Sequence, residues 1–325
     1  MYTPNMYGRV LDAMMCMTRQ CWEDGMVAQA LMETGEYTKL DIVVYDMVLR
    51  QSADGRLCNV ENTPAVTDSS FCIPAVYLTG KQKNNQELIN AALKNIKFLL
   101  YDAERAEEGT LYHMRGTTDI WADSMAFLPY SLALTGHKKE GIAQMRGVFE
   151  RLYDSDKGLC LHMWDECKQR FIRPLAWGVG NGWALTGLLR MLPLYADEGE
   201  SYDWLMATFF KLLDTMLSHM TAEGCFHDVL DDPDTFCESE TAAMIAYTVY
   251  KAALEKILPE NKIEFYLKKA DLIHSSLWEK VDERGIVMNA ASSPSFNHPG
   301  SSVECQAHFL MMEKEKTGIM KLRNV

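Results

Sequence analysis

Two aspartates lie one repeat apart in the chain, and their side chains could divide the work of a general acid and a general base. Asp123 follows Trp121 in the segment 109–124, and Asp68 lies 55 residues earlier in the segment 63–74. Burial beside aromatic rings can raise a carboxyl pKa by up to ~3–5 units, whereas a helix start lowers it by less than about one unit. We therefore expect Asp123 to hold a proton near neutral pH and to act as the acid. A capping role is the alternative for either residue.

Three histidines occupy similar places a few residues after a glycine, and they could meet in one polar pocket. They are His113, His162 and His227. We expect these histidines to hydrogen-bond hydroxyl groups or a carboxylate of a ligand. Metal ligation is the alternative, but the chain has no H-E-x-x-H motif and its nine cysteines form no C-x-x-C pair. We therefore expect no metal ion, no cofactor and no disulfide framework.

A run of glycines between two tryptophans supplies a third candidate part of the site. In the segment 177–183, three glycines and Asn181 stand between Trp177 and Trp183. Glycine allows close approach of the backbone, and indole faces offer flat apolar platforms on which sugar rings stack. The dinucleotide pattern G-x-G-x-x-G is absent. A tight turn between helices with core tryptophans is the alternative.

The elements that position these residues follow from an internal repeat. Five glycine-centred stretches recur at intervals of 49 to 66 residues, which leaves room for two helices each time. Six such helical pairs would use the whole chain and could close into a ring of inner helices sheathed by outer ones. We predict an (α/α)6 barrel with the glycine loops gathered at one rim, and an open helical solenoid is the alternative. The repeat glycines are Gly55, Gly109, Gly158, Gly224 and Gly285.

Helix ends can also be placed from the sequence. Three glycines that follow a threonine, at positions 35, 80 and 136, are predicted to end helices in the left-handed conformation. Near the candidate acid, a residue in 117–119 could cap a helix in which Trp121, Met125 and Leu128 recur at helical spacing. Asp123 would then lie about one turn into a helix.

Composition limits the class of protein. The 325 residues are 48% hydrophobic and no linker divides them, so we expect one domain over residues 1–325. The sequence shows neither a secretory leader nor a membrane-spanning stretch, which predicts a cytoplasmic protein with no membrane partner. The net charge of −13 argues against nucleic acid. A small anionic substrate stays compatible because salt screens charges over roughly 8 Å. The oligomeric state is open, and a homo-oligomer is one option.

Taken in order, these motifs resemble those of the unsaturated glycuronyl hydrolases (glycoside hydrolase families 105 and 88), most closely the unsaturated rhamnogalacturonyl hydrolase group. The resemblance covers nearly the whole chain, and its most specific part is 177–183, which is similar to the motif W-G-R-G-N-G-W. The other matching segments are 21–25, 67–68, 113, 120–123, 162, 238–244 and 304–310. One departure is Val179, where the motif has an arginine. Arg115 and Arg173 are the candidates to replace that cation.

The resemblance implies a function and a set of site residues. It implies release of a 4,5-unsaturated uronic acid from the non-reducing end of lyase-generated oligosaccharides, by hydration of the C4=C5 double bond. Asp123 would be the catalytic acid and Asp68 the second carboxylate. The residues expected to bind the anionic oligosaccharide are Trp22, His113, Arg115, His162, Trp177, Asn181 and Trp183.

Two other functions fit the same residues. The first is an inverting glycosidase that acts on a saturated sugar, with Asp123 as acid and Asp68 as base. The second is a non-catalytic oligosaccharide-binding protein built on the same barrel.

Overall fold

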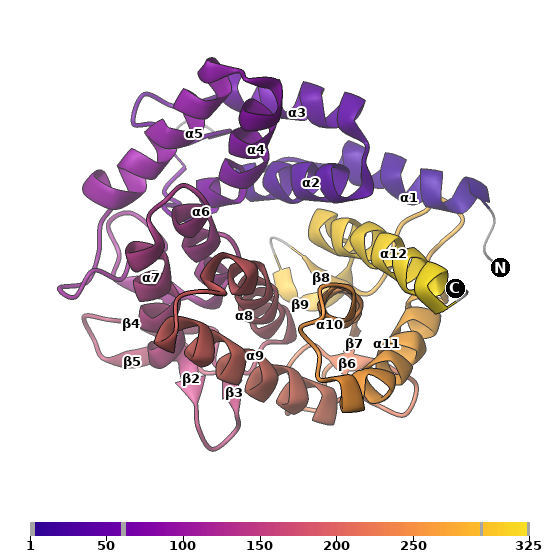
Figure 1. Ribbon diagram of the computed structural model, residues 1–325. Helices are drawn as coiled ribbons and strands as arrows, with labels where there is room; N and C mark the ends of the chain where they lie inside the picture. Colours follow the sequence, from indigo (N-terminus) through magenta and orange to yellow (C-terminus); the bar gives the residue numbers. More distant parts are fainter. Residues whose placement is uncertain (1–3, 60–62, 293–294, 324–325) are drawn as a thin grey trace.

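A ring of six helices lines the centre of the molecule (Figure 1). The computed structural model describes residues 4–59, 63–292 and 295–323. All fourteen residues of α8 are buried, because this helix is covered on every side. The inner helices are α2 (Cys21–Thr34), α4 (Ile73–Lys83), α6 (Leu128–Leu134), α8 (Gly178–Met191), α10 (Ser239–Leu254) and α12 (Val303–Arg323).

Six further helices surround this ring (Figure 1). Each buries one face only, as α5 does with Leu88, Ala92 and Ile96, so their sequences show the apolar stripe of an amphipathic helix. The outer helices are α1 (Pro4–Met17), α3 (Tyr37–Leu49), α5 (Gln86–Lys97), α7 (Lys138–Leu152), α9 (Glu200–Ser218) and α11 (Ile263–Trp278).

The ring closes on itself. Neighbouring inner helices pack in chain order from α2 to α12, and α12 packs against both α2 and α1. An open solenoid would leave its first and last helices apart, so the structure excludes that alternative. The predicted (α/α)6 barrel is confirmed, and one apolar core runs around it between the inner and outer helices.

Short strands and single helical turns fill the connections that lead from an outer helix to the next inner helix, and two further turns, η4 and η5, follow the inner helices α8 and α10. The order β1–β4–β5 forms a three-stranded antiparallel sheet, and the remaining strands pair as β2–β3, β6–β7 and β8–β9. The strands are β1 (Asp119–Trp121), β2 (Tyr153–Asp154), β3 (Leu159–Cys160), β4 (Met163–Asp165), β5 (Arg170–Arg173), β6 (Phe226–His227), β7 (Cys237–Glu238), β8 (Ala290–Ser292) and β9 (Ser295–Gly300). The single turns are η1 (Asp68–Phe71), η2 (Phe98–Asp102), η3 (Ala122–Met125), η4 (Leu192–Tyr195) and η5 (Glu260–Lys262).

Two of the three predicted helix-end glycines are confirmed, because Gly35 and Gly136 have a positive φ at helix ends. The five repeat glycines also have a positive φ, between 70° and 106°. Gly80 was wrongly predicted, because it lies inside α4. A Cβ atom there would stand 2.9 Å from the side chain of Ile89, so this glycine lets α4 and α5 approach closely. The left-handed residue that ends α4 is Asn84, with φ of 52°.

The helix predicted to start at residues 117–119 is also a wrong prediction. Residues 119–121 form β1, which pairs with β4, and η3 follows before α6 begins at Leu128. Ile120 and Met125 are buried in the core, so their apolar spacing reflects burial of an irregular segment. Asp123 therefore lies on a single turn between a strand and a helix.

The cysteine and membrane expectations can be compared with the structure. All nine cysteines are free thiols, and five of them are buried. Over the described ranges, no helix has both the length and the apolar character that crossing a membrane requires.

The contact between α8 and η3 gives a stability prediction. A Cβ atom on Gly187 would lie 2.0 Å from the carbonyl oxygen of Met125. Gly187→Ala should therefore push η3 away from α8 and lower the free energy of unfolding by about 1–3 kcal/mol. Gly8→Ala is the control, because a Cβ atom there meets nothing within 4 Å. Urea denaturation measures both variants, and equal stabilities would contradict the close packing of η3.

Candidate active site

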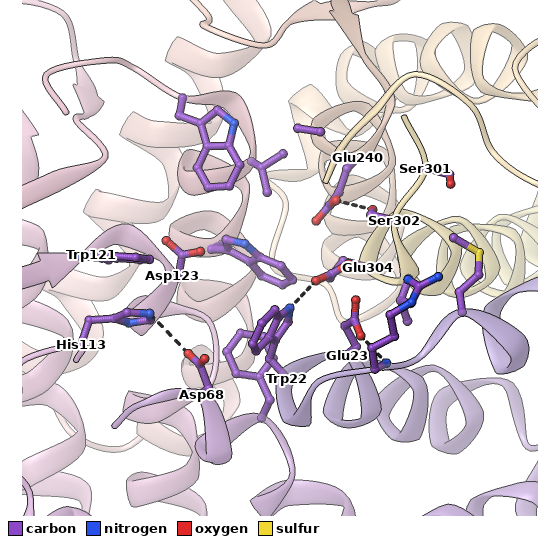
Figure 2. Close-up of a pocket in the computed structure, with 18 residues that line it drawn as sticks. Trp22, Glu23, Asp68, His113, Trp121, Asp123, Glu240, Ser301, Ser302 and Glu304 are labelled. Carbon is purple, nitrogen blue, oxygen red and sulfur yellow. Dashed lines mark hydrogen bonds and ion pairs between the residues drawn. The ribbon is translucent and has the colours of Figure 1, made fainter. Parts of the chain in front are cut away.

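A cavity opens at the rim, among the connections that precede the inner helices, and about 840 Å³ of space lies within its walls and open mouth. Acidic and aromatic side chains dominate its wall, and Figure 2 shows how they converge from segments far apart in the sequence. The carboxyl groups belong to Glu23, Asp68, Asp123, Glu240 and Glu304, and the indoles to Trp22, Trp121, Trp177 and Trp183.

The first carboxylate, Asp68, begins η1 and faces His113 (Figure 2). The distance from Oδ1 of Asp68 to Nε2 of His113 is 3.4 Å. The other ring nitrogen of His113 lies 2.7 Å from Oγ1 of Thr67 and 3.2 Å from Oγ of Ser124. Two hydroxyl groups therefore hold the imidazole in place, and its ring stacks on Trp121 with centroids 4.2 Å apart.

The second carboxylate, Asp123, is supported by a chain of contacts through His162. Oδ2 of Asp123 lies 3.3 Å from Nε2 of His162, and Nδ1 of His162 lies 2.8 Å from Nη1 of Arg173. A guanidinium group can only donate hydrogen bonds, so Nδ1 must accept and the imidazole proton sits on Nε2, the atom that lies 3.3 Å from Asp123. Arg173 also stacks over Trp177, whose ring packs on His162 with centroids 4.3 Å apart.

The two aspartates have pKa values shifted in opposite directions. Burial raises the pKa of Asp68, and the charge of Asp123 adds to this rise although His113 opposes it. Burial also raises the pKa of Asp123, but the contact with His162 and the charges of His162 and His113 outweigh it, so the net pKa is lowered. The expectation that burial leaves Asp123 protonated is therefore corrected for the ligand-free protein. A pair whose pKa values are pushed apart is typical of an acid and a base.

Several predicted binding residues do lie on the cavity wall. The structure brings Trp22, His113, Trp177 and Trp183 together there. Trp22 donates a hydrogen bond from Nε1 to Glu304 over 2.7 Å. His162 is only 2% exposed and stands behind Asp123, so it positions this carboxylate and does not line the cavity.

Asn181 does not face the cavity, contrary to the prediction. The residue is fully buried, and its amide group donates to the carbonyl oxygens of Cys160 and Trp177 and accepts from the amide of Cys160. Every polar atom of the side chain is used in this way. Asn181 therefore fastens the segment that leads to His162 onto the start of α8.

Arg115 and His227 are also placed outside the cavity. Arg115 forms an ion pair with Asp54 at 2.6 Å and stacks over Phe98, so it cannot replace the cation absent at Val179. The ring of His227 is hydrogen-bonded through Nδ1 to the carbonyl oxygen of Thr235. Equal places in the repeat therefore do not give equal places at the rim, because the connecting loops differ in length.

Sequence reasoning gave no role to three glutamates of the wall. Glu240 and Glu304 lie in the first turns of α10 and α12, and Glu23 lies in the first turn of α2. Burial raises the pKa of Glu304 to about 7, with a contribution from Glu23. Glu240 and Glu304 lie in the segments 238–244 and 304–310, which resemble motifs of the family. These residues were given no role because a glutamate at a helix start ordinarily caps the helix. Among the described residues, no group of three or more His, Cys, Asp or Glu side chains is arranged to hold a metal ion.

Comparison with known proteins identifies the family. The sequence pattern of Glycosyl Hydrolase Family 88 matches residues 4–300. This chain belongs to that family. The curated protein "Unsaturated rhamnogalacturonyl hydrolase YesR" of Bacillus subtilis is 24% identical to it over 217 residues, which are 63% of this chain and 60% of YesR. The matched part thus spans less than two thirds of that relative.

Solved structures share the barrel. A possible member of the GH105 family from Salmonella enterica superposes with a TM-score of 0.82 at 15% identity, covering 97% of this chain and 93% of that one. The unsaturated glucuronyl hydrolase of Bacillus sp. GL1 gives a TM-score of 0.69 at 14% identity, covering 92% and 87%. At these identities the similarity shows the fold alone.

The support of Asp123 by His162 predicts a measurable pKa change. His162→Ala removes the contact but leaves the carboxyl group buried, and burial alone raises its pKa. The pKa of Asp123 should therefore rise relative to the unaltered protein, as followed by carbon NMR titration of labelled aspartates. His227→Ala, outside the cavity, is the control and should leave this titration unchanged. An Asp123 titration that His162→Ala does not move would contradict the arrangement.

Proposed function

We propose that this chain removes a 4,5-unsaturated uronic acid from the non-reducing end of short oligosaccharides by hydrating the C4=C5 double bond. The observation that carries the proposal is the pair Asp68 and Asp123, which shares an aromatic cavity and has oppositely shifted pKa values. Membership of family 88 and the activity for which the relative YesR is named support the same chemistry.

The substrate of such a reaction is a vinyl ether, which needs a proton before it needs a nucleophile. Protonation of C4 leaves a positive charge on C5 that the ring oxygen shares. Water then forms a bond to C5 and loses a proton, giving a hemiketal. When the C5–O5 bond breaks, C5 becomes a ketone, and C1 is left with a hydroxyl group and the link to the next sugar. That hemiacetal releases the sugar as an alcohol and leaves an aldehyde at C1.

We assign the proton transfer to Asp123. Its side chain is 25% exposed against 11% for Asp68, so Asp123 is the more accessible member of the pair. The substrate brings its own carboxylate into an acidic cavity, and a like charge raises the pKa of Asp123. Binding therefore loads this residue with the proton that it gives to C4.

The remaining steps use Asp68, whose pKa is raised, and the aromatic side chains of the cavity wall. Once Asp123 has given up its proton, the contact with His162 stabilises its charge, and the carboxylate can accept a proton from the attacking water. Asp68 is the second carboxyl group that can assist this water. The indoles of Trp177 and Trp183 offer faces for the sugar rings.

Three further statements about the protein stay predictions. They are the organisation of residues 1–325 as one catalytic domain, the cytoplasmic location and the oligomeric state, for which a homo-oligomer is one option.

Replacement of Asp123 tests the proposed function. Asp123→Asn removes the transferable proton and should lower turnover about 10²–10⁴-fold, because that is the usual contribution of a positioned acid or base. Loss of the conjugated alkene absorbance near the ultraviolet edge measures the rate on lyase digests of pectin, ulvan and glycosaminoglycans. Asp156→Asn, on an exposed loop, is the control and should keep the full rate. Near-normal turnover in Asp123→Asn would refute the assignment. Release of sugar with the alkene signal retained would refute hydration.

A further inference from the structure

Glu240 presents an unpaired carboxyl oxygen to the cavity. The residue is 2% exposed, and Figure 2 shows its carboxyl group across the cavity from Asp68. Its Oε2 accepts a hydrogen bond from Oγ of Ser302 at 2.7 Å, whereas Oε1 is buried and has no hydrogen-bond partner among the described residues. A buried polar atom without a hydrogen bond lowers the stability of the fold, and a ligand that hydrogen-bonds to this atom would remove that cost.

The surroundings of Glu240 favour its neutral form. Glu238 lies on the same helix start, Glu304 and Cys305 face it from α12, and Asp123 faces it from η3. Burial and the charges of Glu304 and Glu238 raise the pKa of Glu240 well above its ordinary value, against the opposing hydrogen bond from Ser302. Burial and the neighbouring charges therefore favour the protonated, neutral carboxyl group.

The position of that proton follows from the bonding of Ser302. Oγ of Ser302 accepts a hydrogen bond from the amide of Cys305 at 2.9 Å, so its own hydrogen is directed to Oε2 of Glu240. With Oε2 accepting, the acid proton of Glu240 belongs on Oε1. The cavity is thus offered an O–H donor at a position where glutamate ordinarily offers an acceptor.

The wall contains little fixed positive charge for an anionic ligand. Arg19 is the arginine that lines the cavity, and it is exposed at the mouth. Val179 stands where the related motif has an arginine. Arg173 is hydrogen-bonded to His162 and to Asn297, at 2.8 Å each. A carboxylate deep in this cavity must therefore be held by neutral donors, assisted by the positive end of α12.

We propose that Glu240 recognises the carboxylate of the unsaturated uronic acid. Oε1 of Glu240 donates a hydrogen bond to an oxygen of that carboxylate, while Ser302 holds Oε2 of Glu240 in place. This inference rests on the proposed function. It makes Glu240 a specificity-determining residue that contacts the substrate but takes no part in proton transfer to C4. A hydrogen bond from a neutral acid to a carboxylate is charge-assisted and stronger than a bond between two neutral groups.

The proposal predicts a pH-dependent affinity. As pH rises past about 7, Glu304 loses its proton, and loss of the proton of Glu240, whose pKa is also raised by burial, adds further negative charge to the wall. Affinity for an unsaturated uronic acid disaccharide should fall through this range. The methyl ester of the same disaccharide carries no charge, so its affinity should change much less.

Calorimetric binding to Asp123→Asn protein, which retains the cavity while turnover is slow, tests the inference. Adding Glu240→Met should weaken binding of the acid about 10- to 100-fold, the usual range for a lost hydrogen bond to a charged group, and weaken the ester far less. Adding Glu240→Gln keeps a neutral donor, so binding should stay within a few-fold and lose the part of its pH dependence that comes from Glu240. Glu260→Met, on an exposed turn, is the control and should change neither affinity.

Two outcomes would overturn the inference. Equal weakening of acid and ester by Glu240→Met would show that Glu240 does not select the carboxylate. The second outcome is that Glu240→Gln weakens binding of the acid as much as Glu240→Met does. It would show that a neutral hydrogen-bond donor at this position does not hold the carboxylate. Because these are binding measurements, they are separate from turnover. Wild-type protein that binds the acid through Glu240 but leaves the alkene intact would refute the proposed hydration and support this inference.

Discussion

The contact between His162 and Asp123 is the interaction on which the site depends. A carboxylate in a cavity lined by indoles would ordinarily become neutral, because burial disfavours its charge. His162 prevents this in the ligand-free protein, and it can do so only because Arg173 occupies its other ring nitrogen and thereby places the proton on Nε2. The stack of Trp177 on the imidazole holds the plane of this ring. The charge state of Asp123 is therefore set by residues on β5 and at the start of α8.

The barrel supplies the rigidity that such a contact requires. The segment carrying His162 is tied to α8 through Asn181, and η3, which carries Asp123, lies directly against Gly187 of the same helix. Helix starts from the later repeats bring glutamates to the opposite wall. The cavity thus gathers five carboxyl groups, and burial raises the pKa of four of them, which disfavours their charged forms.

Sequence reasoning reached the fold and part of the site. The repeat glycines predicted the barrel because their spacing leaves room for two helices in each repeat. The pairing of Asp68 with Asp123 followed from one repeat of separation. The protonation of Asp123 could not be predicted, because it depends on the tautomer of a histidine on another loop. The prediction that Asn181 binds the ligand was wrong. The sequence does not reveal that backbone groups of Cys160 and Trp177 hydrogen-bond every polar atom of this side chain. Glu240 was missed because Glu238, two residues earlier, is the genuine cap of α10.

The most direct test of the central claim is the position of solvent hydrogen in the product. If Asp123 delivers a proton to C4 of an unsaturated uronic acid, turnover in deuterated water should place one deuterium on C4 of the released acid. Proton NMR and mass spectrometry of that product measure it. One deuterium at C4 together with loss of the double bond is the predicted result. A released uronic acid that keeps its C4=C5 double bond and carries no deuterium at C4 would contradict the account.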